Sequence, residues 1–462
     1  MQNATKKGGF IINRNDSLAN GKILSVLIKL SVPATMAMMV NAIYNIVDTI
    51  FIGRGVGTLG IAGVAIFLPI QIIILSIGAL FGVGGGSAYS RAIGEKNKEK
   101  SKQIIGNVWI CVFIISVIIS IGGYIFSSQI VSLFGASLEV RIYATDYANA
   151  MFIGTLVFPL CVSSNNIIRA EGASKDAMLA MVLGAVINIF LDYIFIFIFD
   201  LGIWGAGLAT SISKYVTFGY IVFYFIKKTS YKISFKYLKI KKEIIRNIFA
   251  VGVSAFIIQV STSLVAVFIN YSLSKLGGDT LVAIYGIVYK INMLFLLPMT
   301  GFVQGMQPII GFNKGAKNYS RIFQTVKTTS KIMLLLSLIG MLAVFIFPET
   351  MIGFFSVDKF IISEGAGILK IVICMMPIVG IYMILVGLFQ SLGDVKMSLF
   401  LSILRQPLLL GIFIFSLPKI VGKIGFWIAF PMSDMFAFIL VFLICIKKII
   451  LIKRGKKEFV RI

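Results

Sequence analysis

The chain has 462 residues, of which 58% are hydrophobic and 13% are charged, and its formal net charge is +25. The mean hydropathy of +0.98 excludes an ordinary soluble globular protein. Apolar stretches of about 20 residues, long enough to cross the hydrocarbon core of a bilayer, recur along the chain. The short alternating segments of a membrane β-barrel do not occur. The composition therefore predicts an all-α polytopic membrane protein.

The basic residues lie between the apolar stretches, where they orient a membrane protein, so we do not expect a nucleic-acid partner. The sequence contains no histidine, which removes the usual proton carrier at neutral pH and the usual transition-metal ligand. None of the four cysteines (Cys111, Cys161, Cys374 and Cys445) has metal-site spacing. Residues 1–22 lack the apolar centre of a cleavable signal peptide. We expect no cofactor, and proton chemistry that uses carboxylates, lysine or tyrosine.

About twelve transmembrane helices are expected, several of them long enough to tilt or bend. In chain order they cover residues 25–52, 60–90, 104–126, 142–168, 177–199, 203–226, 246–274, 281–311, 327–347, 364–391, 398–417 and 424–446. Alternate connections between them are rich in lysine and arginine, most of all the segment 227–245. The positive-inside rule then places both termini, this linker and the basic tail 448–462 in the cytoplasm, and the protein in the cell membrane.

The chain contains an internal duplication. The segment AIGEKNKEKS at 92–101 resembles NKGAKNYSRI at 313–322, which aligns Gly94 with Gly315, and RAEGASK at 169–175 resembles QSLGDVK at 390–396. Both pairs keep the same offset along the chain. Six spans separate the copies, which predicts two parallel six-helix lobes, 1–226 and 246–447, related by an axis along the membrane normal. Two such lobes indicate a transporter whose lobes rock to alternate access.

The first span carries a carboxylate at its centre, which costs about 2.5–3.5 kcal/mol on insertion scales. Asn41, Tyr44, Asn45 and Asp48 have the spacing i, i+3, i+4 and i+7, so they share one face of a helix. A polar stripe on a membrane helix faces the bundle interior or a cavity. Hydrogen bonding between helices is the structural alternative, but the aspartate favours a functional interpretation.

The fifth span repeats this pattern, with Asn188 and Asp192 at i and i+4. A desolvated carboxylate at this depth can take up a proton or bind a hard cation together with amide oxygens. The structural alternative is an ion pair, for example with Lys214 in the next span. In the second half of the chain only Asp434 lies at a comparable depth.

These residues resemble the multidrug and toxic compound extrusion (MATE) family, within it the DinF-like and MepA-like branches. The resemblance covers essentially the whole chain. Its marks are YNIVDTIFIGRGVGTLGIAGVA at 44–65, IIRAEGASKDAM at 167–178, VINIFLDYIFIF at 186–197 and GIWGAGLATSIS at 202–213, together with the duplication. The resemblance implies a V-shaped antiporter that exports small, mostly cationic organic compounds and drugs across the membrane in exchange for H⁺ or Na⁺. We expect the protein to be a monomer, although the sequence itself does not determine the oligomeric state.

The resemblance also implies roles for individual residues. The coupling ion would be bound by a polar cluster in the first lobe, which maps onto Asp48, Asn165, Asn188, Asp192 and Thr210. A gating bend of the first helix would lie at Pro33. The NorM-like branch places acidic residues for Na⁺ in spans seven and ten, but 246–274 and 365–391 contain no Asp or Glu. A sodium site of that type is therefore not expected, and no metal site beyond a Na⁺ at the coupling cluster.

The substrate cavity has candidate residues in both lobes. They are Asn41, Tyr44, Asn45, Gln259, Asn270, Tyr289 and Arg405. Arg405 has three possible arrangements: it faces the cavity, pairs with Asp434 or reaches to the membrane interface. The mechanism that we expect is competition, in which the ion neutralises Asp48 and Asp192 and so expels a cationic drug.

Two other functions agree less well with the sequence. A flippase for a lipid-linked saccharide would use basic residues for the diphosphate, such as Lys290 and Arg405, but the acidic cluster argues against it. A membrane enzyme is disfavoured because the sequence has no metal-ligand cluster and no nucleophile–base pair. We therefore expect no catalytic residues.

Overall fold

The computed structural model describes residues 14–229, 231 and 235–453, and within these ranges it consists of helices and short connections, without strands. Residues 14–20 are helical. The elements of the first half are α2 (Ile23–Gly55), α3 (Thr58–Gly94), α4 (Lys98–Ile125), α5 (Ser127–Leu133), α6 (Leu138–Thr155), α7 (Phe158–Ala170), α8 (Ser174–Tyr193), η1 (Ile194–Ile198), α9 (Gly202–Lys227) and η2 (Phe235–Tyr237). The elements of the second half are α10 (Lys242–Gly315), α11 (Tyr319–Ile346), α12 (Pro348–Gly353), α13 (Lys359–Ile373), α14 (Met376–Leu392), α15 (Val395–Ile403), η3 (Leu404–Leu410), α16 (Gly411–Val421) and α17 (Lys423–Lys453).

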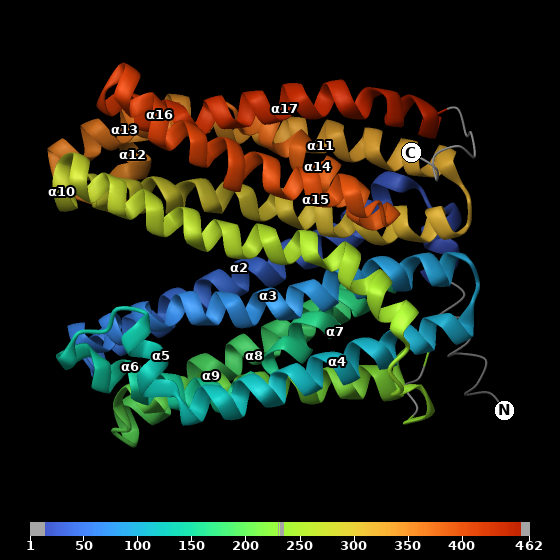
Figure 1. Ribbon diagram of the computed structural model, residues 1–462, viewed down its shortest axis with the longest axis horizontal. Coiled ribbons are helices and arrows are strands. Elements are labelled where there is room, and N and C mark those ends of the chain that lie inside the picture. Colours follow the sequence, from blue (N-terminus) through green and yellow to red (C-terminus); the bar gives the residue numbers. More distant parts are fainter. Residues whose placement is uncertain (1–13, 230, 232–234, 454–462) are drawn as a thin grey trace.

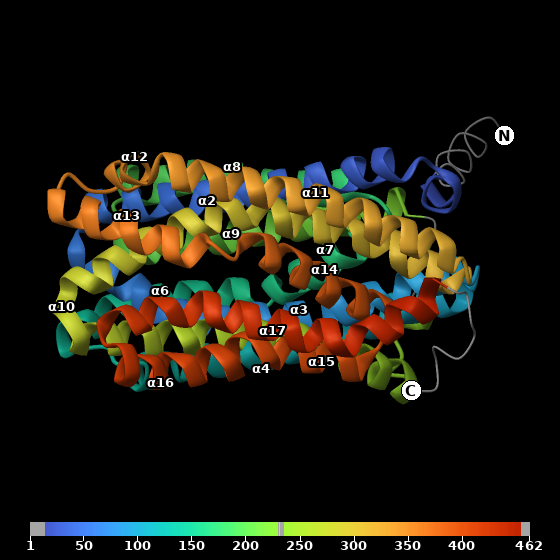
Figure 2. The same cartoon turned by 90° about the horizontal axis from the view of Figure 1, so that it is seen from above.

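The helices form two lobes. Figure 1 shows α2–α9 in one group and α10–α17 in the other, spread apart at one end and close together at the opposite end. Figure 2 shows that both groups run parallel to the same long axis. Helices α2 and α3 of the first lobe contact α10 of the second. The predicted two-lobed helical fold is therefore confirmed, and the lobes meet at the end where α2 begins and α17 ends.

The connection between the seventh and eighth spans differs from the prediction of two separate helices at 246–274 and 281–311. Helical structure is continuous over the 74 residues of α10. A straight helix of this length would be about 110 Å long, far more than a bilayer is thick. Figure 1 instead shows two rods of α10 that meet at the spread end of the lobes. They correspond to the membrane spans Lys242–Ile269 and Thr280–Gly315, so the two predicted spans exist without a non-helical loop.

Two other predicted spans are broken. The span at 142–168 is divided into α6 and α7, and the span at 364–391 into α13 and α14, each with a bend of 45°. Pro159 and Pro377 lie in the first turn of the helix after each break. A proline lacks the backbone N–H and clashes with the preceding turn, so it interrupts a helix and is tolerated where one begins.

Among the described residues, nine helices are long and apolar enough to cross a membrane, and up to eleven when each bent pair is counted as one span. The sixth predicted span, at 203–226, is the helix α9, which does not reach that level of hydropathy. Small and polar residues such as Gly207, Thr210, Ser211, Ser213 and Lys214 lower it. All predicted spans are thus helical in the structure.

The lobes approach each other closely where they meet. A Cβ atom on Gly94 of α3 would lie 1.9 Å from the carbonyl oxygen of Phe312 of α10. A Cβ atom on Gly315 of α10 would lie 2.0 Å from the carbonyl oxygen of Arg91 of α3. Only glycine permits these backbones to pack at this distance.

Candidate functional site

Three helices of the first lobe each contribute two residues, spaced i and i+4, to one polar cluster. The pairs are Tyr44 and Asp48 on α2, Asn188 and Asp192 on α8, and Thr210 and Lys214 on α9. Residues at this spacing lie on the same face of a helix, one turn apart. Helix α2 packs against α8, and α8 against α9, so the three faces meet inside the lobe.

Both carboxyl groups of this cluster are buried. The exposed fraction is 8% for Asp48 and 0% for Asp192, and the two side chains are close enough to share a hydrogen bond when one is protonated. Asn188 is also fully buried, and its Nδ2 donates to Thr210 Oγ1 at 3.3 Å. This hydrogen bond connects α8 to α9.

Four oxygens of the cluster accept no hydrogen bond from the described residues. They are Oδ1 of Asp48, both carboxylate oxygens of Asp192 and Oδ1 of Asn188. Buried polar atoms are nearly always satisfied, because an unmade hydrogen bond costs about 1–3 kcal/mol. Carboxylate and amide oxygens are suitable ligands for a hard cation, and carboxylates also accept protons. The residues present therefore fit a coupling cation, H⁺ or Na⁺.

Lys214 lies at the edge of this cluster. Its Nζ donates to Tyr44 Oη at 3.3 Å and stacks on the Tyr44 and Phe158 rings, 5.1 and 5.3 Å from their centroids. Lys214 is within electrostatic range of Asp48. However, the ion pairs among the described residues do not include one between Lys214 and either aspartate. The alternative in which Lys214 neutralises Asp192 is thus wrong for this conformation.

Asn165 is buried nearby on α7, but its amide has other partners. Its Nδ2 donates to the carbonyl of Ala177 at 2.9 Å, and its Oδ1 accepts from the guanidinium of Arg169. The structure brings Asp48, Asn188, Asp192 and Thr210 together but gives Asn165 a bridging role between α7 and α8. Its place in the coupling site stays a prediction.

Tyr147 on α6 was not predicted from the sequence. It is almost fully buried, and it lies within electrostatic range of Asp48, Asp192 and Tyr44. Its ring also packs edge-to-face on Phe67, with centroids 5.5 Å apart. The sequence signal was available, because Tyr147 follows Asp146 in the same predicted span, but a single tyrosine does not stand out in a chain with 16.

The remaining polar residues of α2 point elsewhere. Asn45 is exposed, and its Nδ2 donates to the backbone carbonyl of Asn41, which is half-buried. Helix α2 continues without interruption through Pro33, which is buried. The bend predicted at Pro33 therefore does not break the helix here, and gating at this proline stays a prediction.

A large chamber lies in the second lobe. Its volume is about 440 Å³, and every residue that lines it belongs to α10, α13, α14, α15, η3 or α17. Tyr289 and Arg405 are among them, as predicted, and Tyr285, Tyr382 and Phe430 add aromatic walls. Asn41, Tyr44 and Asn45 lie in the other lobe, and Gln259 is not among the lining residues. The side chain of Asn270 lies outside the described residues.

The chamber contains an ion pair. Nε of Arg405 in η3 donates to Oδ1 of Asp434 in α17 at 2.6 Å. The guanidinium lies 5.9 Å from the ring centroid of Tyr382, whose hydroxyl donates to the carbonyl of Leu401. Of the three possible arrangements of Arg405, it adopts the pairing with Asp434 while also lining the chamber. Among the described residues that line this chamber, the only carboxylate is therefore neutralised, in contrast to the first lobe.

Comparisons with known proteins match most of the chain. The MatE family model matches residues 33–194 and again residues 254–415. The starts of the two matches, at 33 and 254, are separated by the same offset as Gly94 and Gly315. The multidrug export protein MepA of Staphylococcus aureus (strain N315) is 28% identical over 409 residues, which cover 87% of this chain and 89% of MepA.

Solved transporter structures are similar to this chain over more than 90% of its length. The MATE multidrug transporter DinF-BH, solved in a complex, is 38% identical, with a TM-score of 0.86 over 92% of this chain and 95% of that one. A multidrug resistance MATE family transporter of the MOP superfamily, solved in an outward-facing conformation, has a TM-score of 0.88 and 28% identity over 95% of this chain and 98% of that one.

Proposed function

This chain belongs to the MatE family, and we propose that it is a cation-coupled antiporter that exports amphipathic, mostly cationic drugs and other toxic organic compounds across the cytoplasmic membrane. The related MepA is a multidrug export protein, and DinF-BH is a multidrug transporter. The coupling ion is H⁺ or Na⁺, and the protein acts as a transporter rather than as an enzyme.

One observation carries the proposal: the four buried oxygens of Asp48, Asn188 and Asp192 that accept no hydrogen bond from the described residues. Two carboxylates so close together, and out of contact with water, do not both stay charged without a cation. Binding and release of a proton or of Na⁺ therefore changes the charge of the first lobe. That charge change can bias the lobes between two arrangements, because the ion then has different affinities for the two states.

The orientation in the membrane follows from the basic connections. The end where the lobes meet carries a group of lysines. Lys96 and Lys317 lie in the short loops that follow α3 and α10, and Lys98 and Lys314 lie in the helix turns beside these loops. The positive-inside rule assigns this end to the cytoplasm. The lobes then spread apart toward the outside, which supports an outward-facing conformation like that of the related transporter.

The substrate has a site in the chamber of the second lobe. A volume of about 440 Å³, with walls that are mostly apolar and aromatic and carry some polar groups, suits a drug-sized amphipathic molecule. Asp48 and Asp192 are too deeply buried for a molecule of that size to touch them in this conformation. We therefore propose that drug and ion occupy different lobes and influence each other through the rocking of the lobes, instead of competing for the same carboxylates.

The flippase alternative is not favoured. It requires basic residues that are free to bind a diphosphate, but the guanidinium of Arg405 is held by Asp434 at 2.6 Å. Lys290 is exposed and does not line the chamber.

The function is tested with purified protein in liposomes. Efflux of a fluorescent organic cation is followed under an imposed pH gradient and then under an imposed Na⁺ gradient, for the wild type and for Asp48→Asn. Transport driven by one gradient and lost in the variant identifies the antiporter and its ion. Absence of transport under both gradients by folded wild-type protein would overturn the proposal.

A further inference from the structure

A short helix that precedes α2 contacts both lobes at the end where they meet. It comprises residues 14–20, and Figure 1 shows it in dark blue at this end. It ends at Gly21, whose backbone N–H donates to the carbonyl of Ser17 at 3.0 Å. We call it the entry helix, because the chain continues from it directly into α2 of the first lobe.

The entry helix is anchored to the first lobe at two points. The guanidinium of Arg14 forms an ion pair with Asp176 of α8 at 3.2 Å and donates to the hydroxyl of Tyr224 of α9 at 3.2 Å. Leu18 is 2% exposed. It packs beside the turn between α7 and α8, since a Cβ atom on Gly172 would lie 3.5 Å from Leu18 Cδ1.

The second lobe binds the other end of the same helix. Nε of Arg321, in the first turn of α11, donates to the carbonyl of Leu18 at 2.9 Å, and its Nη2 donates to the carbonyls of Gly21 at 2.6 Å and Ser17 at 3.3 Å. Nδ2 of Asn313 in α10 also donates to the Leu18 carbonyl, at 3.1 Å. The last carbonyls of a helix lack partners within it and carry partial negative charge, so a guanidinium suits them. The two lobes are thus connected through one helical turn.

The segment that precedes α10 is placed in an equivalent way. Residues 235–241 are separated from residues 14–20 by the same offset as the repeated motifs, and so is α11 from α4. In this copy the hydroxyl of Tyr237 donates to the carboxylate of Glu99 on α4 at 2.9 Å. Residues 235–241 follow α9 and therefore have to pass the first lobe. The entry helix does not join the lobes along the chain, so its contact with α11 is not a consequence of connectivity.

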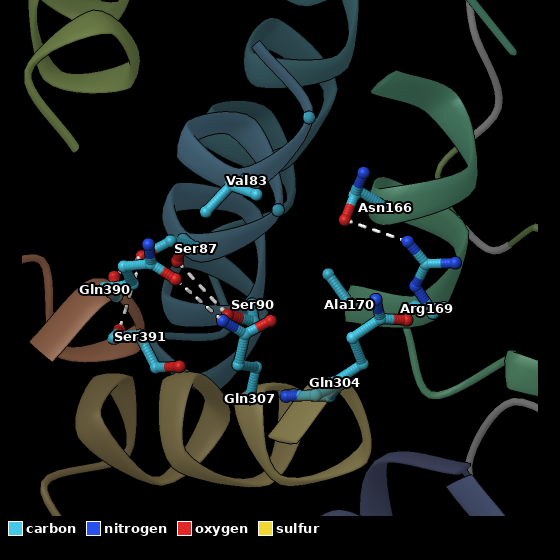
Figure 3. A pocket seen from close by; sticks show the side chains of 13 residues that line it. Val83, Ser87, Ser90, Asn166, Arg169, Ala170, Gln304, Gln307, Gln390 and Ser391 are labelled. Carbon is cyan, nitrogen blue, oxygen red and sulfur yellow. Dashed lines mark hydrogen bonds between the residues drawn. The ribbon is translucent and has the colours of Figure 1, made fainter. Parts of the chain in front are cut away.

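The direct interface between the lobes is partly polar at this end. Figure 3 shows a small pocket between α3 and α7 of the first lobe and α10 and α14 of the second. Its volume of about 20 Å³ has room for one or two water molecules. The Ser87 hydroxyl of α3 donates to the backbone carbonyl of Gln390 in α14. Such a neutral hydrogen bond beside water contributes little, whereas bonds from a charged guanidinium are about twice as strong.

We propose that the entry helix is a latch, which holds the lobes closed at this end and must leave α11 before they separate there. Arg14, Leu18 and the connection to α2 keep it on the first lobe. Arg321 and Asn313 bind it to the second. A helix of this length is only about 10 Å long, so it does not stay bound to both lobes when they move apart. After release, the freed carbonyls and the guanidinium of Arg321 are hydrated.

The latch stabilises the closed arrangement relative to the open one. Loss of the hydrogen bonds from one guanidinium should shift the ratio of open to closed protein by about tenfold. This inference rests on the rocking of the lobes in the proposed function, but not on the identity of the ion or the drug. Its test measures lobe separation without a drug or an ion gradient, so it can fail while transport is present, and the reverse.

The test uses spin labels across the closed end, in protein whose native cysteines are replaced by alanine. Lys98→Cys and Ser320→Cys place the labels at exposed positions in the first turns of α4 and α11. Arg321→Gln is expected to raise the ratio of open to closed protein by about tenfold. Arg321→Lys keeps the charge but loses the planar fork, so its rise should be smaller. Arg246→Gln, which removes an exposed arginine near the start of α10, should change nothing. An unchanged ratio in folded Arg321→Gln would overturn the proposal.

A second pair of distances follows the latch itself in Arg321→Lys. One label is placed at Asn20→Cys, an exposed position of the entry helix, and the other at Ser320→Cys or at Lys175→Cys in the first turn of α8. As the lobes separate, the distance from Asn20 to Ser320 should lengthen, and the distance from Asn20 to Lys175 should stay constant. A constant Asn20–Ser320 distance in protein with separated lobes would contradict release from α11. If Arg321→Gln does not fold, Arg14→Gln weakens the latch from the other lobe and should also raise the open fraction, and no rise would overturn the proposal.

Discussion

Gly94 and Gly315 occupy equivalent positions in the two lobes and pack reciprocally against each other's helices. Gly94 lies against the carbonyl of Phe312, and Gly315 lies against the carbonyl of Arg91. Phe312 and Arg91 are themselves equivalent, because they are separated along the chain by the same offset as the two glycines. The duplication thus generates a symmetric closure between the lobes, with backbone against backbone.

Replacing either glycine by alanine should prevent this closure. The added Cβ would lie about 2 Å from a backbone carbonyl, so α3 and α10 must move apart. We expect Gly94→Ala and Gly315→Ala to lower drug transport by about tenfold each and to shift spin-label distances at this end toward the open state. Gly122→Ala in α4 is the matched control, since its Cβ would contact nothing within 4 Å. Normal transport in both Gly94→Ala and Gly315→Ala would contradict the claim that transport requires this close packing of α3 and α10.

The ion pair of the second lobe should be needed for stability. Asp434→Asn leaves the guanidinium of Arg405, whose side chain is 23% exposed, without its charged partner. Breaking a fully buried ion pair costs about 3–5 kcal/mol, and the exposure of Arg405 to the chamber lowers that cost. We expect a clear fall in the melting temperature of the purified protein in detergent. The double variant Arg405→Met with Asp434→Leu removes both charges and should recover most of the loss. An Asp434→Asn variant with the melting temperature of the wild type would contradict a stabilising role for this ion pair.

Lys214 should weaken cation binding at the coupling site. Its ammonium is within electrostatic range of Asp48 and repels a cation there. In Lys214→Gln, the coupling cation should half-saturate transport at a concentration lower by about threefold to tenfold. The control Lys175→Gln removes an exposed lysine in the first turn of α8 and should change nothing. A higher half-saturating concentration in Lys214→Gln would mean that Lys214 assists binding instead.

If drug and ion bind in separate lobes, the Kd of the drug should depend on the concentration of the coupling cation in a characteristic way. The Kd for a fluorescent drug should rise with the concentration of the coupling cation and then reach a plateau, because the linkage between two sites is finite. Competition at Asp48 and Asp192 would instead give a Kd that rises in proportion to the cation without limit. The Kd of the drug for detergent-solubilised protein, measured by isothermal titration at increasing concentrations of the coupling cation, distinguishes a plateau from a rise without limit.

Binding of the drug in the chamber can be tested by replacing one of the aromatic residues that line it. Tyr289→Ala should raise the Kd for the drug by about threefold to tenfold, through the loss of ring contacts. The half-saturating cation concentration should not change. Tyr124→Ala, at an exposed position on α4, is the control. An unchanged Kd in Tyr289→Ala would place the drug outside this chamber.

The fold could be predicted from the sequence because hydropathy and repeated motifs are patterns that extend over many residues. The apolar stretches locate the spans, and the constant offset between the repeated motifs defines the two lobes. The hairpin inside α10 and the bends before Pro159 and Pro377 could not be derived in the same way. Whether a helix continues or breaks at such a point depends on the packing of its neighbours, which no local pattern records.

The site was predictable only where residues share a helix. The spacing of Tyr44 with Asp48 and of Asn188 with Asp192 identified two faces of the cluster. Tyr147 was missed because its role comes from the packing of α6 against the other helices. The chamber of the second lobe was only partly predicted, since Tyr289 and Arg405 line it but its apolar and aromatic walls resemble any membrane helix in sequence.

The central claim is that the buried carboxylates of the first lobe couple the ion to the drug, and drug-driven ion exchange tests it most directly. A drug gradient is imposed on liposomes that contain the protein, and movement of H⁺ or Na⁺ is recorded for the wild type, Asp192→Asn and the control Asp200→Asn. Asp200 is exposed in the connection before α9, and its left-handed backbone also accommodates asparagine. We predict exchange in the wild type and in Asp200→Asn, and none in inserted, folded Asp192→Asn. Full exchange in Asp192→Asn would contradict the account.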